Sequence, residues 1–266
     1  MKAIMYEKYG TPDVLRLREI DKPKPKANEV LIKVHTASIN AADWHLLTAD
    51  IFLVRFMMGL FKPKFNILGT DVAGQVEAVG ADVRQFKVGD AVFGDIFGHG
   101  GGSLAEYVTA PEGALALKPS ALSFEETAAA PLAAITALQG LRDEGQIQSG
   151  QKVLIQGASG GVGTFAVQIA KSFGTKVTAV CSPRNVEMVR SLGADHVIDY
   201  TKEDFTKSGV RYDLILAANG YHPIAAYKRA LTPHGIYVMA GGKFKQMFET
   251  MLLGPLMSEK NGRKLK

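Results

Sequence analysis

Apolar and polar positions follow two different patterns along the chain, and the change falls near residue 120. Before it, short segments alternate apolar and polar residues, as expected of strands that are buried on one face only. Glycines punctuate these segments, which is typical of a curved sheet. Several short strands at nearly regular spacing predict a small β-barrel or sandwich, with strands at residues 30–39, 69–80 and 89–96.

After residue 120 the pattern predicts strands that alternate with helices. The sequence SFEE at residues 123–126 has the form of a capping box, and a second helix is expected between Pro131 and Gly145. Apolar strands then alternate with amphipathic helices and short loops, which is the arrangement of a parallel, doubly wound α/β sheet. We expect five strands in this sheet, at residues 152–157, 176–181, 196–200, 213–219 and 235–242.

The composition is that of a globular protein with room for two domains: 266 residues, of which 47% are hydrophobic and 21% charged. A single cysteine, Cys181, excludes a disulfide framework and a cysteine-rich zinc site, and it favours a reducing, cytoplasmic location. The N-terminus lacks the apolar stretch of a signal peptide. The most apolar segment, residues 51–65, contains Arg55 and is too short to span a bilayer, so no membrane partner is predicted.

Charge adds little to this picture. The net charge of +5 and the pI near 9.1 are mild, and the basic residues are spread along the chain. Only residues 258–266 form a basic run, which is expected to be a solvated tail rather than a nucleic-acid patch. A nucleic-acid partner is therefore not favoured.

KVLIQGASGGVG, residues 152–163, places a glycine-rich turn between a predicted strand and a predicted helix. In such a unit the first amides of the helix, together with its dipole, bind a pyrophosphate. The three positions of the G-x-G-x-x-G fingerprint hold Ala158, Gly160 and Gly163, with alanine at the first. The alternative is a tight packing turn without a ligand. We predict dinucleotide binding by Ala158, Ser159, Gly160, Gly161, Val162 and Gly163.

The residues after the second predicted strand point to NADPH. An NAD site would require Asp or Glu there, to bind both ribose hydroxyls. The chain instead continues with Ser182 and Arg184, and no carboxylate occurs between Gln168 and Glu187. A hydroxyl and a guanidinium suit a 2′-phosphate, although Arg184 is also explained as a solvated loop residue.

Three motifs carry a resemblance to a known family: residues 150–171 (GQKVLIQGASGGVGTFAVQIAK), 68–80 (LGTDVAGQVEAVG) and 191–200 (SLGADHVIDY). With them, the chain resembles the zinc-free quinone oxidoreductase (zeta-crystallin-like) branch of the medium-chain dehydrogenase/reductase superfamily, from residue 1 to about 245. The resemblance implies an α/β fold with a GroES-like β-barrel for the substrate (1–120) and a doubly wound parallel Rossmann sheet for NADP (121–245). The active site is expected in the cleft between them.

The same resemblance implies positions for further site residues. Around the cofactor it places Ser182, Arg184 and Tyr200 at the 2′-phosphate, Asn219 near the adenosine, and Gly241 and Gly242 near the nicotinamide. On the catalytic side we expect Asn40, Asp43, Thr70 and Thr136 near the substrate and the nicotinamide, with Asn40 and Thr136 donating to a carbonyl or holding the carboxamide. Because Asn and Asp favour turns, a turn that closes a barrel strand also explains Asn40 and Asp43.

No metal site is predicted. Asn40 and Thr70 stand where zinc-dependent relatives carry ligands, and neutral oxygen donors make a poor zinc site. None of the six histidines forms a close ligand pair on a helix; His45 near Asp43 is the nearest approach to one. Without a Lewis acid, hydride delivery to an activated C=C bond is favoured, because the substrate's own carbonyl spreads the charge as an enolate.

The predicted function is therefore NADPH-dependent reduction of a small electrophile: a quinone, an enone or an alkenal. One alternative is an enoyl-thioester reductase of the same superfamily, which requires a tyrosine acid; Tyr9 and Tyr107 are candidates that the sequence does not rank. Another alternative is a non-catalytic NADPH-binding protein, structural or RNA-binding.

The C-terminal segment, residues 246–266, is expected to be a remnant of a longer return segment. Relatives continue for some tens of residues and add a sixth strand that is often a dimer contact. The chain is accordingly predicted to be C-terminally truncated, with an open sheet edge. A homodimer is compatible with this expectation but weakened by the missing strand.

Overall fold

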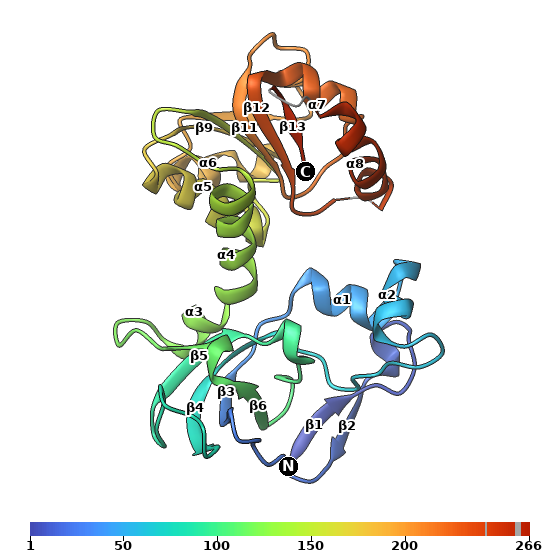
Figure 1. The fold of residues 1–266 in the computed structure, drawn as a ribbon, viewed down its shortest axis with the longest axis vertical. Coiled ribbons are helices and arrows are strands. Elements are labelled where there is room, and N and C mark those ends of the chain that lie inside the picture. Colours follow the sequence, from blue (N-terminus) through green and yellow to red (C-terminus); the bar gives the residue numbers. More distant parts are fainter. Residues whose placement is uncertain (243, 259–261) are drawn as a thin grey trace. The chain divides into compact units, whose positions relative to one another are not determined.

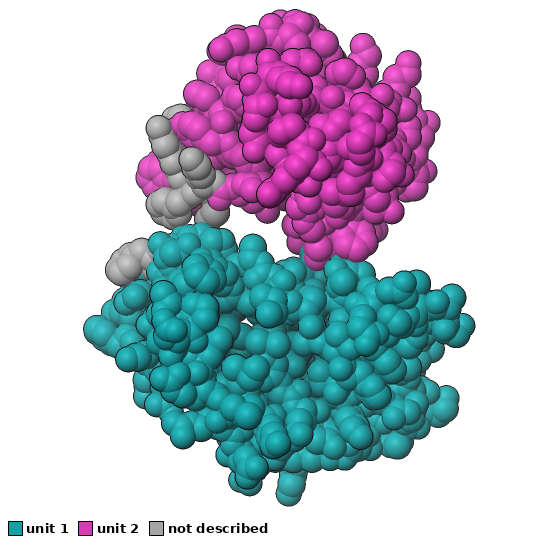
Figure 2. All heavy atoms as spheres, turned by 180° about the vertical axis from the view of Figure 1, so that it is seen from behind, with its two compact units in different colours: residues 1–132 teal, residues 133–266 magenta. Residues whose placement is uncertain are grey.

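The computed structural model describes residues 1–242, 244–258 and 262–266. The chain divides into two compact units, Met1–Leu132 and Ala133–Lys266, which Figure 2 colours teal and magenta. Among the described residues, no helix combines the length and the apolar character that crossing a membrane requires.

The first unit is built on antiparallel strands, as the alternating pattern predicted (Figure 1). Its core lies over the five-stranded sheet, where Val30 and Ile32 of one strand meet Val72 and Val76 of the next. The main sheet has the order β6-β3-β4-β5-β7, formed by β3 (Glu29–Thr36), β4 (Asp71–Val79), β5 (Ala91–Asp95), β6 (Tyr107–Pro111) and β7 (Leu115–Leu117). A separate pair is formed by β1 (Lys2–Met5) and β2 (Arg16–Glu19).

Short helices complete the first unit. Its α-helices are α1 (Ala41–Thr48), α2 (Phe52–Met58) and α3 (Phe124–Ala128), and its 3₁₀ turns are η1 (Pro12–Val14), η2 (Phe97–His99) and η3 (Glu112–Ala114). The predicted capping box opens α3: Glu126 N donates to Ser123 Oγ (3.1 Å), and Ser123 N donates to Glu126 Oε2 (2.8 Å). This reciprocal pair satisfies two amides that the helix itself leaves without acceptors.

The second unit is a six-stranded parallel sheet of the doubly wound type, in the order β10-β9-β8-β11-β12-β13. The strands are β8 (Lys152–Gln156), β9 (Lys176–Cys181), β10 (His196–Asp199), β11 (Tyr212–Ala217), β12 (Leu231–Met239) and β13 (Lys264–Leu265). The helices are α4 (Pro131–Leu138), which begins in the first unit, α5 (Gly161–Ser172), α6 (Val186–Ser191), α7 (Ile224–Ala230) and α8 (Phe244–Met257), with the π-helical turn η4 (Gln139–Glu144) and the 3₁₀ turn η5 (Pro183–Asn185).

The parallel sheet has an apolar core on each face, which explains its continuous apolar strands. Val153 and Ile155 of β8 face one core, to which α5 and α6 contribute, while Leu154 faces the other, under α7 (Figure 1). The sheet thus has helices on both sides, and the doubly wound arrangement predicted from the sequence is confirmed.

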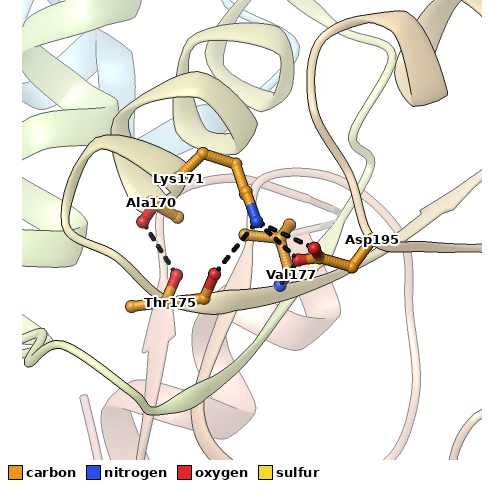
Figure 3. Close-up of polar contacts among 5 residues, drawn as sticks. All are labelled: Ala170, Lys171, Thr175, Val177 and Asp195. Carbon is orange, nitrogen blue, oxygen red and sulfur yellow. Dashed lines mark hydrogen bonds and ion pairs between the residues drawn. The ribbon is translucent and has the colours of Figure 1, made fainter.

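A polar contact fixes the end of α5 against the start of β9 (Figure 3). Lys171 Nζ reaches both carboxylate oxygens of Asp195, at 2.8 and 2.9 Å, and Asp195 Oδ2 also accepts from Val177 N (2.7 Å). In the loop between α5 and β9, Thr175 Oγ1 donates to Ala170 O (2.8 Å). The contact joins two of the motifs that carry the family resemblance, so their spacing has a structural reason.

The expectation of five strands and a solvated C-terminal tail was wrong. Residues Lys264–Leu265 form β13, a sixth strand parallel to β12, and the Leu265 side chain is 4% exposed. Lys266 N donates to Tyr237 O and Met239 N to Lys266 O, both at 2.9 Å. A two-residue strand inside a basic run has too few apolar positions to show a period of two, so the pattern missed it.

Removing the Leu265 side chain will destabilise the second unit. Leu265→Ala deletes buried methyl groups and is expected to lower the free energy of unfolding by about 2 kcal/mol. The matched control is Leu17→Ala on β2, where the side chain is 67% exposed and no measurable loss is expected. Urea denaturation followed by far-ultraviolet circular dichroism measures both; equal midpoints for Leu265→Ala and the parent chain would show that the tail is solvated after all.

Candidate functional site

The glycine turn after β8 is held in shape by contacts that leave no room for side chains. Gly157 has φ +79°, and a Cβ on it would lie 2.7 Å from the amide nitrogen of Asn219. A Cβ on Gly163 would lie 2.1 Å from the carbonyl oxygen of Gly157. The strand end and the start of α5 therefore pack backbone against backbone, as the fingerprint requires of its last glycine.

The first amides of α5 are available to a ligand. Gly160 is the N-cap residue, and no side chain caps the helix. Within the described residues, no protein acceptor takes the amide hydrogens of Ser159, Gly161 or Val162. A Cβ on Gly160 would meet nothing closer than 3.6 Å, so glycine there keeps space open on the outer side of the turn. Free amides, an uncapped helix and this space fit a diphosphate group.

A cavity of about 610 Å³ lies at the carboxyl ends of the parallel strands, beside this turn. Open α/β sheets bind their ligands at this edge. Of the residues predicted from the sequence, Ser159, Gly160, Ser182, Arg184, Tyr200 and Asn219 line it. Ala158, which is fully buried, and Gly161, Val162, Gly163, Gly241 and Gly242 do not line it.

Further lining residues were not predicted. They include Cys181, the last residue of β9, and, in the segments that follow β9, β10 and β11, Asn185, Phe205, Tyr221 and His222. Phe205 and His222 meet edge to face with ring centroids 5.0 Å apart, so part of the wall is aromatic. The available signal was positional: each of these residues lies at or after the carboxyl end of a parallel strand.

Charges in the cavity favour an anion near Arg184. No described carboxylate forms an ion pair with Arg184, and Ser182 Oγ beside it accepts from Asn185 Nδ2 (3.0 Å). Asp204 also lines the cavity, and hydrogen bonds from the hydroxyl and the amide of Thr206 hold its pKa below the usual value, so it is negatively charged. Lys207 Nζ, 3.4 Å from Asp204 Oδ2, offsets that charge. Glu203 is exposed at the rim.

Gly241 and Gly242 sit where the loops after β11 and β12 approach each other. Gly241 N donates to Ala217 O (3.2 Å), and a Cβ on Gly241 would lie 2.6 Å from Ala218 O. Gly242 has φ +132°, which side chains disfavour. Close backbone packing at Gly241 and the positive φ of Gly242 therefore explain why glycine occupies both positions. Their role at the nicotinamide stays a prediction.

In the first unit, the structure brings Asn40, Thr70 and Asp71 together. Asn40 Nδ2 donates to Thr70 Oγ1 (3.0 Å), to Ser38 Oγ (3.0 Å) and to Asp71 Oδ2 (2.9 Å). Asp71 is fully buried, and its other oxygen accepts from Leu132 N (2.9 Å) at the start of α4. Two of the predicted residues, Asn40 and Thr70, thus belong to one hydrogen-bonded cluster with Asp71 at its centre.

Asp43 holds the other side of this cluster. Its Oδ2 accepts from Asn40 N (2.8 Å), and its Oδ1 accepts from Gly69 N (2.9 Å). Burial raises the pKa of Asp43 and that of Asp71, against the hydrogen bonds that both carboxylates accept. Asn40 is the N-cap residue of α1, so the turn expected at this position is present as a helix start.

The role of Asn40 as a donor to the substrate does not fit this geometry. A carboxylate only accepts, so Asp71 fixes the amide nitrogen of Asn40 toward itself, and both hydrogens of that nitrogen are directed at the cluster. The carbonyl oxygen of Asn40 is therefore an acceptor, and it faces the backbone amide of Asp43 in the capping box at the start of α1. Thr136 lies on α4, one turn beyond Leu132.

Comparisons with known proteins show the family to which the chain belongs. Residues 26–120 match the family model described as "Alcohol dehydrogenase GroES-like domain", and residues 161–263 match the one described as "Zinc-binding dehydrogenase". A quinone-oxidoreductase homolog from Spinacia oleracea is 38% identical over 250 residues, which span 88% of this chain and 73% of that protein. The chain belongs to the quinone oxidoreductase family of medium-chain dehydrogenases/reductases.

Two other members show how far the likeness extends. An NADPH-dependent alkenal/one oxidoreductase from Arabidopsis thaliana is 39% identical over 234 residues, which cover 83% of this chain and 58% of that protein. The solved quinone oxidoreductase from Coxiella burnetii superposes with a TM-score of 0.80 at 34% identity, over 89% of this chain and 74% of that one. The GroES-like and Rossmann-type fold classes expected from the sequence are confirmed.

In this member of the quinone oxidoreductase family, the candidate metal-ligating side chains have other partners. Asn40 Nδ2 donates to Thr70 Oγ1 (3.0 Å), so these two side chains are paired with each other, and both offer only neutral oxygen donors. His45 Nδ1 lies 2.8 Å from Asp50 Oδ1 rather than pairing with Asp43. No group of three or more His, Cys, Asp or Glu side chains suited to a metal ion occurs in the part of the chain that the structure describes.

The buried carboxylates predict a pH signature for the first unit. Because burial raises the pKa of Asp71 above its ordinary 3.8, the unfolded chain releases this proton first, and stability falls as pH rises through the folded pKa. Asp71→Asn removes that titration. The stability of the parent chain minus that of Asp71→Asn should therefore decrease as pH rises from about 4 to 7.

Fluorescence of Trp44, the single tryptophan of the chain, reports unfolding of the first unit during urea titrations at each pH. A difference between the two proteins that grows with pH would mean that Asp71 is stabilised as a carboxylate. Asp90→Asn serves as the control, because hydrogen bonds donated by Lys87 lower the pKa of the half-buried Asp90 and reverse the sign of the expected change.

Proposed function

We propose that this chain is an NADPH-dependent reductase that delivers hydride to quinones and to the activated C=C bond of enones or alkenals. The observation that carries the proposal is the uncapped start of α5, whose first amides have no acceptor among the described residues. They adjoin Ser159 and Gly160, which line a cavity together with Arg184 and Ser182. The names of the relatives, a quinone oxidoreductase and an alkenal/one oxidoreductase, support the substrate classes.

The cofactor assignments combine the lining of this cavity with the positions that the family resemblance implies. The diphosphate binds to the amides of Ser159, Gly161 and Val162, where the dipole of α5 favours negative charge. The 2′-phosphate lies against Ser182, Arg184 and Tyr200, the adenosine near Asn219, and the nicotinamide toward Gly241 and Gly242. When bound, the reduced nicotinamide supplies the hydride.

The first unit contributes a polar cluster whose geometry is already set. Asn40 presents an acceptor oxygen, which suits the carboxamide nitrogen of a nicotinamide better than a substrate carbonyl. Thr70 and Asp43 hold Asn40 in place, and Asp71 ties the cluster to the start of α4, the helix that carries Thr136. Pre-set hydrogen bonds of this kind reduce the reorganisation that a reaction requires.

Arg184→Ala will separate the two nicotinamide cofactors. Loss of a charge-assisted contact to the 2′-phosphate is expected to weaken NADPH binding about tenfold to a hundredfold and to leave NADH binding unchanged. Arg190→Ala, on the following helix and ion-paired to Glu187, is the matched control and should bind both cofactors as the parent does. Fluorescence titration of each cofactor decides the point. Equal losses for NADPH and NADH in Arg184→Ala would remove the assignment of the 2′-phosphate.

The turn offers a second, steric test. Gly160→Ala places a methyl group in the space kept for the diphosphate, so NADPH affinity should fall at least about tenfold while the melting temperature stays near that of the parent. Gly163→Ala is the contrasting variant: its Cβ would overlap the Gly157 carbonyl, so the melting temperature itself should fall. If Gly160→Ala binds NADPH as tightly as the parent, the diphosphate does not lie on this turn.

The reaction is tested by NADPH oxidation with 1,4-naphthoquinone, an alkenal and a crotonyl thioester. Turnover with the quinone and the alkenal is expected; turnover with the thioester alone would favour the enoyl-thioester reductase alternative. Binding of NADPH without turnover on any acceptor would favour a non-catalytic protein. A homodimer and a cytoplasmic location stay predictions.

A further inference from the structure

A second, much smaller cavity lies in the first unit beside Thr70. Its volume is about 20 Å³, enough for one water-sized group such as a carbonyl oxygen. Apart from Thr70 and Tyr6, its walls are apolar side chains and glycines: Leu46, Met58, Phe65, Ile67, Leu68, Gly69, Phe97, Gly100 and Gly101.

Tyr6 is the unusual member of this wall. The residue is 3% exposed, yet no described residue forms a hydrogen bond with its hydroxyl; only its backbone amide is bonded, to Asn66 O (2.9 Å). The hydroxyl oxygen of Tyr6 is not one of the fully buried side-chain atoms that lack a partner in the described residues, so a water-sized group can reach it. An unpaired phenol in the wall of an oxygen-sized cavity is what a ligand oxygen would satisfy.

Other donors around the cavity are already committed. The amide of Gly69 donates to Asp43 Oδ1 (2.9 Å), that of Gly100 to Phe97 O (3.3 Å) and that of Gly101 to Ile96 O (3.0 Å). Because these three amides already have acceptors, the hydroxyl of Tyr6 is the donor that remains for an acceptor in the cavity.

The phenol keeps its proton at neutral pH. Burial, with contributions from the neighbouring Tyr9 and the negative charge of Asp43, raises the pKa of Tyr6 to about 12. Tyr6 is therefore a hydrogen-bond donor in an apolar setting, where such bonds are strong.

We propose that the hydroxyl of Tyr6 donates a hydrogen bond to the carbonyl oxygen of the substrate. This inference rests on the proposed reductase function and names the residue that polarises the enone or alkenal. When the β-carbon accepts a hydride, the electron pair of the C=C bond shifts to form the enolate, whose oxygen takes the negative charge. Tyr6 stabilises that oxygen and retains its own proton, and a proton from water reaches the α-carbon to give the saturated carbonyl compound.

The tyrosines considered from the sequence do not fill this role. Tyr9 Oη already donates to Gly59 O (2.7 Å), and the ring of Tyr107 lies 3.8 Å from Lys22 Nζ. Neither residue lines the cavity. Tyr9 is in the same segment as Tyr6, which makes Tyr9→Phe a matched control.

Tyr6→Phe removes only the hydroxyl oxygen. For an alkenal we expect kcat/KM to fall about a hundredfold to a thousandfold, the loss typical of one oxyanion donor. The NADPH dissociation constant should be unchanged, and the melting temperature should be unchanged or higher because the lost hydroxyl had no partner. Tyr9→Phe should show the reverse: a lower melting temperature and an unchanged kcat/KM.

A spectroscopic measurement tests the contact without turnover. The infrared C=O stretch of a bound saturated ketone should move to lower wavenumber in the parent chain and in Tyr9→Phe, but not in Tyr6→Phe. If none of the tested acceptors supports NADPH oxidation by the parent chain, the proposed function fails. The infrared shift of the bound ketone still tests the contact with Tyr6. If Tyr6→Phe keeps the parental kcat/KM, or if the ketone shows no shift dependent on Tyr6, the inference is overturned while the reductase function stands.

Discussion

The contact of Gly163 with the carbonyl of Gly157 is the constraint on which the rest of the second unit depends. A Cβ on Gly163 would lie only 2.1 Å from the carbonyl oxygen of Gly157, so glycine at this position lets the start of α5 pack against the end of β8. The amides of Ser159, Gly161 and Val162 have no acceptor among the described residues. Because the sheet is parallel, the loops after the neighbouring strands end at the same edge and surround these amides with Ser182, Arg184 and Tyr200.

The first unit depends on a different kind of constraint, a buried carboxylate that orients its neighbours. Asp71 accepts from Ser38, Asn40 and the amide of Leu132, and so settles which end of the Asn40 amide faces inward. The cost of burying the charge, visible in the raised pKa of Asp71, is offset by these hydrogen bonds. A cluster arranged in this way is rigid, and it leaves one acceptor oxygen and, nearby, one unpaired phenol.

Local sequence signals predicted most of the fold and part of the site. The capping box at Ser123, the apolar strands and the glycine turn depend on nearby residues, and they are visible in short windows. The sixth strand escaped because only one of its two residues, Leu265, is buried, and that burial comes with its pairing to β12. A two-residue strand is too short to show an alternating pattern in the sequence, so its pairing with β12 could not be predicted.

Site residues were predictable where a motif dictates the backbone, and not where side chains from distant segments meet. The direction of the Asn40 amide depends on Asp71, and the burial of Tyr6 depends on elements from Leu46 to Gly101, so neither is visible in the local pattern. The aromatic wall of Phe205 and His222 joins two loops for the same reason.

Calorimetric titration of the intact chain with NADPH tests the central claim most directly, namely that the free amides of α5 hold a diphosphate. The account predicts saturable binding at one site, tighter for NADPH than for NADH. Absence of heat and of saturation at millimolar NADPH would contradict it.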